Sequence, residues 1–439
     1  MQPQDLQRAF YEMLLESQFW SPRQIEDYQR GQLTQLLRHA RRNVPFYEKR
    51  LDPVFTASGD IDWDRWEDIP IVRRSDMLEH RDAMLARERP AGHGALSTIQ
   101  SSGSTGQPIG VTSNRLTVMA ANANRWRSHR WAGVDWSQTY TGRDAFRPES
   151  EYPHGEKLGA WGPAWDPDAA RGTGYRISRN ASPEQLLEFI SRTSTRYFST
   201  GPKTMQVLAL EAERLGLDIR LAGVFTFGER LGDDDRAAIK RAFGAATHEA
   251  YSSKEGGQMA HPCPEGHGLH VHAESILLEI VDDDGRRVPP GEQGRVVITP
   301  FVSTAQPLIR YAQGDVASLA ASCPCGRGLP LLAAVHGRTT AIFSHPDGQT
   351  VSRMLSEPGR EMLKCTFWQI AQVGPLQFEV RYVPLDWDVP GDEASTVALF
   401  RSIFFSDAEV AFVRKREIPL TAGGKYIEYI NEWARRRQP

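Results

Sequence analysis

The chain has 439 residues, of which 24% are charged, and its formal net charge is −3 at pH 7. A domain usually holds roughly 100–200 residues, so we expect two or three compact units, and the near-neutral charge argues against a nucleic-acid partner. No apolar run reaches the roughly 18 residues needed to cross a bilayer, and residues 1–5 do not resemble a signal peptide. Four cysteines are too few for a disulfide scaffold and favour a reducing compartment. The sequence therefore predicts a soluble cytoplasmic protein with no membrane or nucleic-acid partner.

The first half of the chain alternates helix and strand signals. Ser21, Pro22 and Gln24 form a capping-box pattern, which predicts a helix ending near Asn43. After a mainly polar connection at 60–90, we expect strands at 95–99, 109–112, 197–200 and 223–228 and helices at 116–130, 182–192, 202–215 and 233–243. Residues 136–176 are rich in Gly, Pro, Trp and Tyr, and their pattern assigns no element. Strands that alternate with helices of about 10–15 residues predict an α/β domain.

The pattern changes after Tyr251. Two apolar runs at 276–281 and 295–299, separated by a turn at Asp284-Gly285, predict a β-meander. From about Gly337 the remaining length fits one further small domain, with strands expected near 377–383 and 410–414. We therefore expect a large multi-layer α/β domain over residues 1–337, which includes the meander, and a small α+β domain over residues 338–439.

One loop, Ser101–Pro108, joins two extended runs and combines two glycines with three serines and a threonine. Glycines let the backbone approach a ligand closely, while hydroxyls and backbone N–H groups donate hydrogen bonds, a combination that suits phosphate oxygens. The loop is not a Walker-type phosphate loop, because it lacks the Gly-Lys-Ser/Thr ending before a helix. Taken alone, it also fits a flexible surface loop.

Further short motifs follow this loop. They are Phe227-Gly228-Glu229 at the end of a strand, Tyr251–Gly257, Leu308–Asp315 with an acid after a strand-like run, Gly337-Arg338, and Pro419–Lys425. Each motif alone also fits an ordinary turn or a surface residue. Their order and spacing, together with residues 36–47, resemble the acyl-adenylate-forming superfamily, and specifically the phenylacetate–coenzyme A ligase family with its capsular-polysaccharide-associated relatives. The resemblance extends from about residue 20 to residue 430.

The resemblance implies a reaction in two steps. A carboxylate attacks the α-phosphate of ATP, pyrophosphate leaves, and the resulting acyl-adenylate is then attacked by the thiol of coenzyme A. Because two anions must meet in the first step, the site needs phosphate donors, Mg²⁺ and a cation. The resemblance also implies a large domain that binds ATP and the acid, a small mobile domain that carries a catalytic lysine, and a homodimer. It does not identify the acid.

The resemblance assigns roles to individual residues. Ser102, Gly103, Ser104, Thr105 and Gly106 would hold the phosphates of ATP. Gly228, Glu229 and Tyr251 would belong to the nucleotide pocket, and Asp315 would accept hydrogen bonds from the ribose, with Arg338 nearby. Glu255 would bind Mg²⁺, a hard cation that carboxylates and phosphates hold together. Lys425 matches the lysine of the mobile domain that neutralises charge during adenylation.

The chain departs from the family pattern at four places. Gln107 replaces the lysine that usually ends the phosphate loop, and Lys254 replaces a hydroxyl residue next to Glu255. Lys254 is therefore a third catalytic candidate, since its charge would offset the charge lost at Gln107. Ala312-Gln313 stands where the family has Arg/Lys-Thr, and Thr339-Thr340 stands where acidic residues are common. Two alternatives follow: transfer of the acyl group to an amine, a hydroxyl or a carrier-protein thiol, and a catalytically silent nucleotide-binding scaffold.

A second set of residues has the chemistry of a metal site. Cys263, His270, Cys323 and Cys325 supply three thiols and an imidazole, which suit a closed, structural Zn²⁺ site. His267 and His272 compete with His270 as the fourth ligand. Members of the resembled family carry a similar zinc-binding set, and a group of unrelated reduced residues is the alternative. The fourth cysteine, Cys365, is expected in the core.

Overall fold

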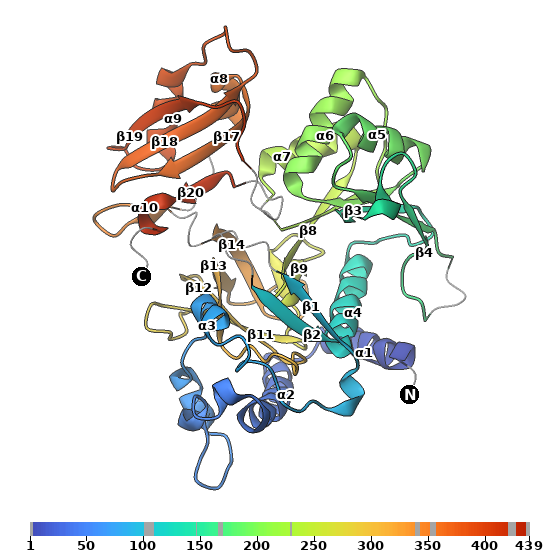
Figure 1. The fold of residues 1–439 in the computed structure, drawn as a ribbon, viewed down its shortest axis with the longest axis vertical. Helices are drawn as coiled ribbons and strands as arrows, with labels where there is room; N and C mark the ends of the chain where they lie inside the picture. Colours follow the sequence, from blue (N-terminus) through green and yellow to red (C-terminus); the bar gives the residue numbers. More distant parts are fainter. Residues whose placement is uncertain are drawn as a thin grey trace. The chain divides into compact units, whose positions relative to one another are not determined.

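The computed structural model describes residues 3–100, 109–145, 147–165, 170–228, 231–338, 343–351, 357–419 and 427–435. The chain divides into two compact units (Figure 1). The first consists of Met1–Ile99, Gly110–Gln313 and Ser318–Ala334, and the second of Gln100–Ile109, Gly314–Ala317 and Val335–Pro439. The domain boundary placed between residues 337 and 338 stays a prediction.

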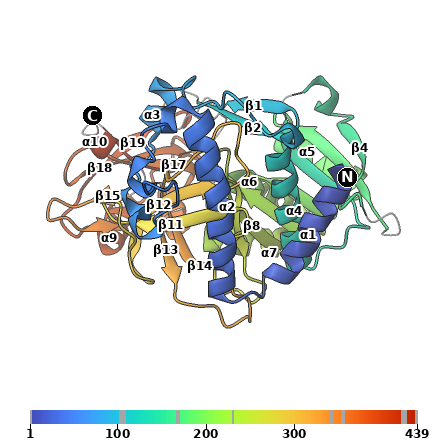
Figure 2. The same ribbon diagram turned by 90° about the horizontal axis from the view of Figure 1, so that it is seen from below.

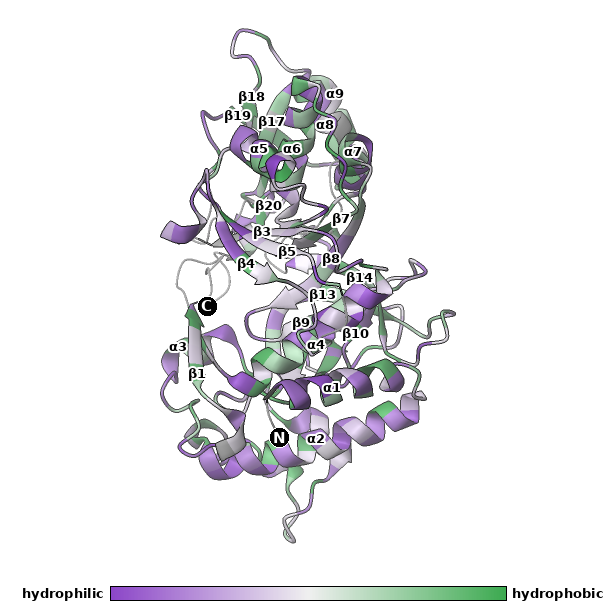
Figure 3. Ribbon diagram, turned by 90° about the vertical axis from the view of Figure 1, so that its right-hand side faces the viewer, coloured by the Kyte–Doolittle hydropathy of each residue, from purple (hydrophilic) through white to green (hydrophobic). Residues whose placement is uncertain are grey.

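The N-terminal helices pack on the first unit. Ser21 closes the predicted capping box at the start of α2 (Pro22–Asn43), because its side chain accepts from the backbone of Gln24 while the Gln24 side chain accepts from Ser21 N. The preceding helix α1 (Pro3–Ser17) packs against α4 (Arg115–Trp131), as Figure 2 shows. Hydrophilic and hydrophobic residues alternate along both N-terminal helices (Figure 3), and the apolar ones face the core.

A long mixed sheet forms the centre of the first unit. Its order is β11-β12-β13-β14-β10-β9-β8-β7-β6-β3-β5-β4. The strands are β3 (Tyr140–Ala145), β4 (Glu156–Ala160), β5 (Thr173–Ser178), β6 (Tyr197–Thr200), β7 (Gly223–Phe227), β8 (Ala246–Ser253), β9 (Gly257–Pro262), β10 (Leu269–Val271), β11 (Ile276–Val281), β12 (Gln293–Pro300), β13 (Tyr311–Ala320) and β14 (Leu331–Arg338). Neighbours within β5, β3, β6, β7 and β8 run parallel, whereas β8–β9, β9–β10 and β11–β12 are antiparallel.

Helices cover the parallel part of this sheet. They are α5 (Pro183–Arg192), α6 (Pro202–Leu215) and α7 (Asp233–Phe243), and their apolar faces share one core with β6 and β7. Phe189, Phe198 and Phe243 are fully buried there. The α/β architecture and the β-meander of β11 and β12 are therefore confirmed. This unit also contains α3 (Arg74–Glu79), a two-stranded sheet of β1 (Leu96–Gln100) and β2 (Gly110–Asn114), and several short 3-10 helices.

The second unit contains a separate small sheet. Its order is β19-β18-β17-β20, and the core includes Trp368, Phe378 and Phe400. The elements are β15 (Phe343–Ser344), β16 (Thr350–Val351), α8 (Glu357–Leu363), β17 (Cys365–Gln372), β18 (Gln377–Pro384), α9 (Glu393–Ile403), β19 (Glu409–Arg414), β20 (Tyr429–Asn431) and α10 (Glu432–Arg435). Cys365 is buried in this core, as expected. The predicted α+β character is confirmed.

Two sequence interpretations need correction. Residues 136–176, to which no element was assigned, contain β3, β4 and β5, whose polar and glycine-rich strands are stabilised by pairing with β6 and with one another. Asp315 does not follow a strand but lies inside β13, just after Gly314, whose φ of +80° bends the strand. Among the described helices, none combines the length and the apolar character needed to cross a membrane.

Candidate active site and metal centre

The parallel strands bring several polar segments to one edge of the sheet. Because β3, β5, β6, β7 and β8 run in the same direction, their carboxyl ends lie together. Arg179 follows β5, Gly228 follows β7 and Lys254 follows β8. In open α/β sheets, ligands bind in the crevice at this edge, because loops from several strands converge there. This edge is therefore the candidate active site of the first unit.

The turn after β8 holds two predicted catalytic residues, Lys254 and Glu255. Ser253 Oγ accepts a hydrogen bond from Gly256 N at 2.8 Å and donates to Gln313 Oε1 at 3.2 Å. A Cβ at Gly256 would lie 2.6 Å from Met259 Sδ, so a larger residue there would have to displace the Met259 side chain. Burial lowers the pKa of Lys254, the Glu255 charge opposes this shift, and the Arg179 charge adds to it. Gln313, one of the departures from the family pattern, thus supports the turn that presents Lys254 and Glu255.

The segment after β7 is fixed by an acid that the sequence did not reveal. Gly228 ends β7 with a φ of +84°, a conformation that favours glycine. Glu249 on β8 accepts hydrogen bonds from Leu231 N at 3.1 Å and from Arg236 Nη2 at 2.7 Å. Glu249 therefore fixes the segment that begins at Leu231, two positions after the predicted nucleotide residue Glu229. The only feature of the sequence that could have pointed to Glu249 is that it is an acidic residue two positions before Tyr251.

In the second unit the structure brings together Asp315 and Arg338. Arg338 Nε lies 3.0 Å from Asp315 Oδ1, and the Asp315 side chain is 10% exposed. The neighbouring Gly314 leaves room for this pair, since a Cβ there would lie 3.2 Å from Arg338 Nη1. An ion pair of this kind keeps a carboxylate charged and fixes its orientation. The geometry suits the predicted role of Asp315 as an acceptor for hydroxyl groups.

Several predicted site residues lie outside the described residues: Ser102, Gly103, Ser104, Thr105, Gly106, Gln107, Glu229, Thr339, Thr340 and Lys425. The strands that flank the phosphate loop are described, and the loop begins and ends on them. Thr98 Oγ1 on β1 and Thr112 Oγ1 on β2 lie 2.9 Å apart, so the two strands pair through side chains as well as backbone.

The predicted metal ligands Cys263, His270, Cys323 and Cys325 converge. Their ligand atoms all lie within 4.8 Å of one another. Cys263 Sγ lies 3.7 Å from Cys323 Sγ, and His270 Nε2 lies 3.2 Å from Cys325 Sγ. A tetrahedral zinc ion with Zn–S bonds of about 2.3 Å would hold two sulfurs about 3.8 Å apart. The four side chains therefore fit one tetrahedral ion.

The surroundings of His270 select it over the two competing histidines. His270 Nδ1 lies 3.3 Å from the carbonyl oxygen of Leu329, an arrangement that leaves Nε2 to face the thiols. Burial lowers the pKa of His270 to about 4, so its imidazole is neutral at pH 7, as metal ligation requires. His267 is turned toward Glu265 at 3.4 Å, and His272 belongs to a different polar network.

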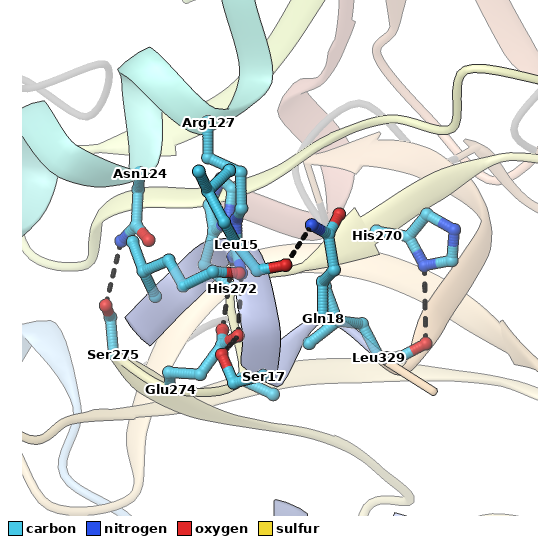
Figure 4. Close-up of polar contacts among 12 residues, drawn as sticks. Leu15, Ser17, Gln18, Asn124, Arg127, His270, His272, Glu274, Ser275 and Leu329 are labelled. Carbon is cyan, nitrogen blue, oxygen red and sulfur yellow. Dashed lines mark hydrogen bonds and ion pairs between the residues drawn. The ribbon is translucent and has the colours of Figure 1, made fainter. Parts of the chain in front are cut away.

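That network surrounds Arg127 on α4 and was not found from the sequence (Figure 4). The Arg127 side chain is fully buried, and Nη1 donates to Glu274 Oε1 at 2.6 Å and to the Leu14 carbonyl oxygen at 3.0 Å. Its Nη2 contacts His272 Nδ1 at 2.6 Å, and Ser17 donates to Glu274 at 2.6 Å. The network therefore ties α1 to α4 and to the segment that follows β10.

Comparisons with known proteins agree with this architecture. No family model matches the chain. A 2-hydroxyisobutyryl-CoA ligase in the postadenylation state, in complex with R3-HIB-AMP, superposes with a TM-score of 0.71 and 20% identity, and the match covers 93% of this chain and 89% of that one. An amide bond synthetase, McbA from Marinactinospora thermotolerans, has a TM-score of 0.53 and 17% identity, over 81% and 77% of the two chains. The chain thus has the fold of the adenylate-forming ligases.

Sequence comparison identifies more specific relatives among the ligases. A phenylacetate–coenzyme A ligase of Thermus thermophilus is 28% identical over 329 residues, which span 71% of this chain and 69% of that protein. A ligase of the same name from Pseudomonas putida is 26% identical over 310 residues, 67% of this chain and 66% of that protein. The predicted resemblance to the phenylacetate–coenzyme A ligases is confirmed.

Proposed function

We propose that the chain is an AMP-forming ligase that activates a carboxylic acid with ATP, releases pyrophosphate and transfers the acyl group to coenzyme A. The observation that carries the proposal is the similarity to named phenylacetate–coenzyme A ligases over 71% of the chain. The fold adds support, because a 2-hydroxyisobutyryl-CoA ligase with the same fold binds both 2-HIB-AMP and CoA in its thioesterification state.

In this proposal each predicted nucleotide-binding residue has a separate role. Asp315, oriented by Arg338 at 3.0 Å, accepts hydrogen bonds from the ribose. Gly228, Glu229 and Tyr251 border the adenine, and the loop residues Ser102–Gly106 donate to the phosphates. Glu255 holds Mg²⁺, since a carboxylate together with phosphate oxygens is the usual ligand set of this ion. When bound, Mg²⁺ withdraws charge from the phosphates and so favours attack by a second anion.

Two cations would reduce the repulsion between the acid and the α-phosphate. Like charges about 4 Å apart repel by about 4 kcal/mol at an effective dielectric of 20, so a neighbouring cation lowers the barrier appreciably. Lys425 provides this charge in the family pattern. Lys254 provides a further charge on the turn next to Glu255, where it takes the place of a hydroxyl residue and offsets the missing charge at Gln107.

The cysteine–histidine cluster is proposed to bind structural zinc. Its four ligands leave no position for a substrate, so the ion would join β9, β10 and the loop before β14. Metal analysis of the purified chain is expected to give one zinc per chain, and Cys323→Ser is expected to abolish it. Cys365→Ser is the matched control, since Cys365 lies in the other unit and should leave the zinc content unchanged.

Transfer to an amine is the second candidate, because the fold is also that of an amide bond synthetase. The decisive assay measures pyrophosphate release with Mg-ATP and a panel of carboxylic acids, with and without coenzyme A, and identifies the products by mass spectrometry. An acyl-thioester that forms only with coenzyme A is expected, and Lys425→Ala should abolish acid-dependent pyrophosphate release. An acyl-adenylate that accumulates despite coenzyme A would favour another acceptor. No turnover and no ATP binding would favour a silent scaffold.

The expected homodimer and the expected cytoplasmic location are part of the same proposal. Light scattering of the purified chain tests the first, and a monomer at micromolar concentration would contradict it. Microscopy of a fluorescently tagged full chain tests the second.

A further inference from the structure

Arg143, at the end of β3, carries a positive charge that no acid neutralises among the side chains the structure describes. Its Nη1 donates to Thr204 Oγ1 at 3.1 Å and its Nη2 donates to the Arg179 carbonyl oxygen at 2.6 Å. Its Nε is buried and has no hydrogen-bond partner among the described residues. A partly buried guanidinium without a carboxylate is unfavourable, because it has lost water without gaining a counter-charge.

The groups around Arg143 increase this positive charge. Thr204 lies in the first turn of α6, so the guanidinium sits beside the positive end of a helix dipole. Burial and the charge of Arg179 lower the pKa of Arg143 to about 10, which leaves it protonated at pH 7. The nearby Lys203 lies 3.6 Å from Asp235, so that lysine already has a counter-charge.

Three cationic residues lie near the carboxyl edge of the sheet. Arg143 is on β3, Arg179 follows β5, and Lys254 follows β8, which is separated from β3 by β6 and β7. At about 4.8 Å per strand, the backbones of β3 and β8 are about 14 Å apart. Arg179 follows β5, which neighbours β3 on the side away from β8, and its charge acts on both Arg143 and Lys254.

We infer that Arg143 and Arg179 bind the second carboxylate of a dicarboxylic acid whose first carboxylate is activated next to Lys254. Guanidinium groups bind carboxylates through paired hydrogen bonds, and Arg143 still has donors to offer. The separation of β3 and β8 requires the second carboxylate to be remote from the first. This inference rests on the proposed function, since it names the acid that the ligase would adenylate.

The test compares matched acids in the pyrophosphate-release assay: hexanoate with adipate, and 4-methylbenzoate with terephthalate. Hydrogen bonds to a charged group predict a preference of about 10–100-fold in kcat/KM for the dicarboxylates. Arg143→Gln should remove this preference and leave the KM for ATP unchanged, while Arg143→Lys should restore part of it. Arg196→Gln is the matched control, because Arg196 also donates to a backbone carbonyl but precedes β6 at the opposite edge.

Each outcome decides the inference. Equal turnover of the paired acids by the unaltered chain would overturn it, whether or not Arg143→Gln folds, and would leave the proposed function standing. A raised KM for ATP in Arg143→Gln, with unchanged acid preference, would assign the cations to the triphosphate instead. Absence of turnover with every acid would overturn the inference and the proposed function together. Thermal melting of each variant shows that a lost preference is not caused by unfolding.

Discussion

Arg127 and Arg143 are both inside the first unit, yet their surroundings are opposite. Arg127 is fully buried and meets Glu274 at 2.6 Å, a backbone carbonyl at 3.0 Å and His272 at 2.6 Å. Arg143 is partly buried and meets only a hydroxyl and a backbone carbonyl among the described residues. The first arginine has its counter-charge built into the fold, whereas the second has no carboxylate partner among the described residues.

This difference shows how a charge that stabilises the fold can be distinguished from a charge that binds a ligand. A buried pair that loses one partner leaves an uncompensated ion, so the remaining charge destabilises the folded state strongly. A cation that has no carboxylate partner among the described residues should not leave such an ion behind when it is removed. The two arginines should therefore respond differently to substitution: loss of Arg127 should destabilise the folded state strongly, and loss of Arg143 should not.

The largest effect is expected from Arg127→Met. The substitution leaves Glu274 buried without its partner, which should lower the free energy of unfolding by about 3–5 kcal/mol. Urea unfolding followed by tryptophan fluorescence measures it. Arg30→Met is the matched control, because the Arg30–Glu26 pair has a similar distance of 2.7 Å but is about half exposed, so its loss should amount to less than about 0.5 kcal/mol. Similar losses in the two variants would contradict the importance of burial.

Lys254→Thr should have the next largest effect, on activity rather than stability. It restores the hydroxyl of the family pattern but leaves Gln107 in place, so the site loses a cation. Loss of one electrostatic contact at a reacting centre typically lowers kcat by about 10²–10³-fold. Adding Gln107→Lys should restore most of the activity in the pyrophosphate assay. A double variant as inactive as the single one would show that the two positions do not exchange charge.

How far the sequence predicted this molecule depends on the range of the interactions involved. The capping box at Ser21 was predicted because it involves residues three positions apart. Helix α1 was not predicted, since its position depends on distant contacts such as Arg127 with the carbonyl of Leu14. His270 and His272 are two positions apart and chemically equal, so only the loop that brings Cys325 to 3.2 Å from His270 distinguishes them. Glu249 and Arg143 were not identified from the sequence, because their roles depend on the order of the strands in the sheet.

Acidification should weaken the folded state through His261 on β9, whose Nδ1 lies 2.9 Å from His272 Nε2 and which therefore adjoins the Arg127 network. Burial, together with the charges of Arg125 and Arg127, lowers the pKa of His261 to about 3. Between pH 6.5 and about 3 the unfolded chain therefore binds a proton that folded His261 does not, and stability falls as the pH falls. The expected loss from this residue is about 2 kcal/mol at pH 5, since each pKa unit corresponds to about 1.4 kcal/mol. Urea midpoints at pH 7.5 and 5 measure it, and His261→Gln should reduce the difference. An unchanged difference would assign the pH dependence to other groups.

Only a small change in stability is expected from Arg143→Gln, in contrast to Arg127→Met. Glutamine keeps a hydrogen-bond donor but carries no charge, so the variant avoids the desolvation of an ion. The free energy of unfolding, measured by urea as for Arg127→Met, should change by no more than about 1 kcal/mol, because neither a carboxylate nor a large cavity is left behind. A loss of several kcal/mol would make Arg143 a structural residue like Arg127. In that case interactions within the fold would compensate the Arg143 charge, and no uncompensated charge would remain for the second carboxylate of a substrate.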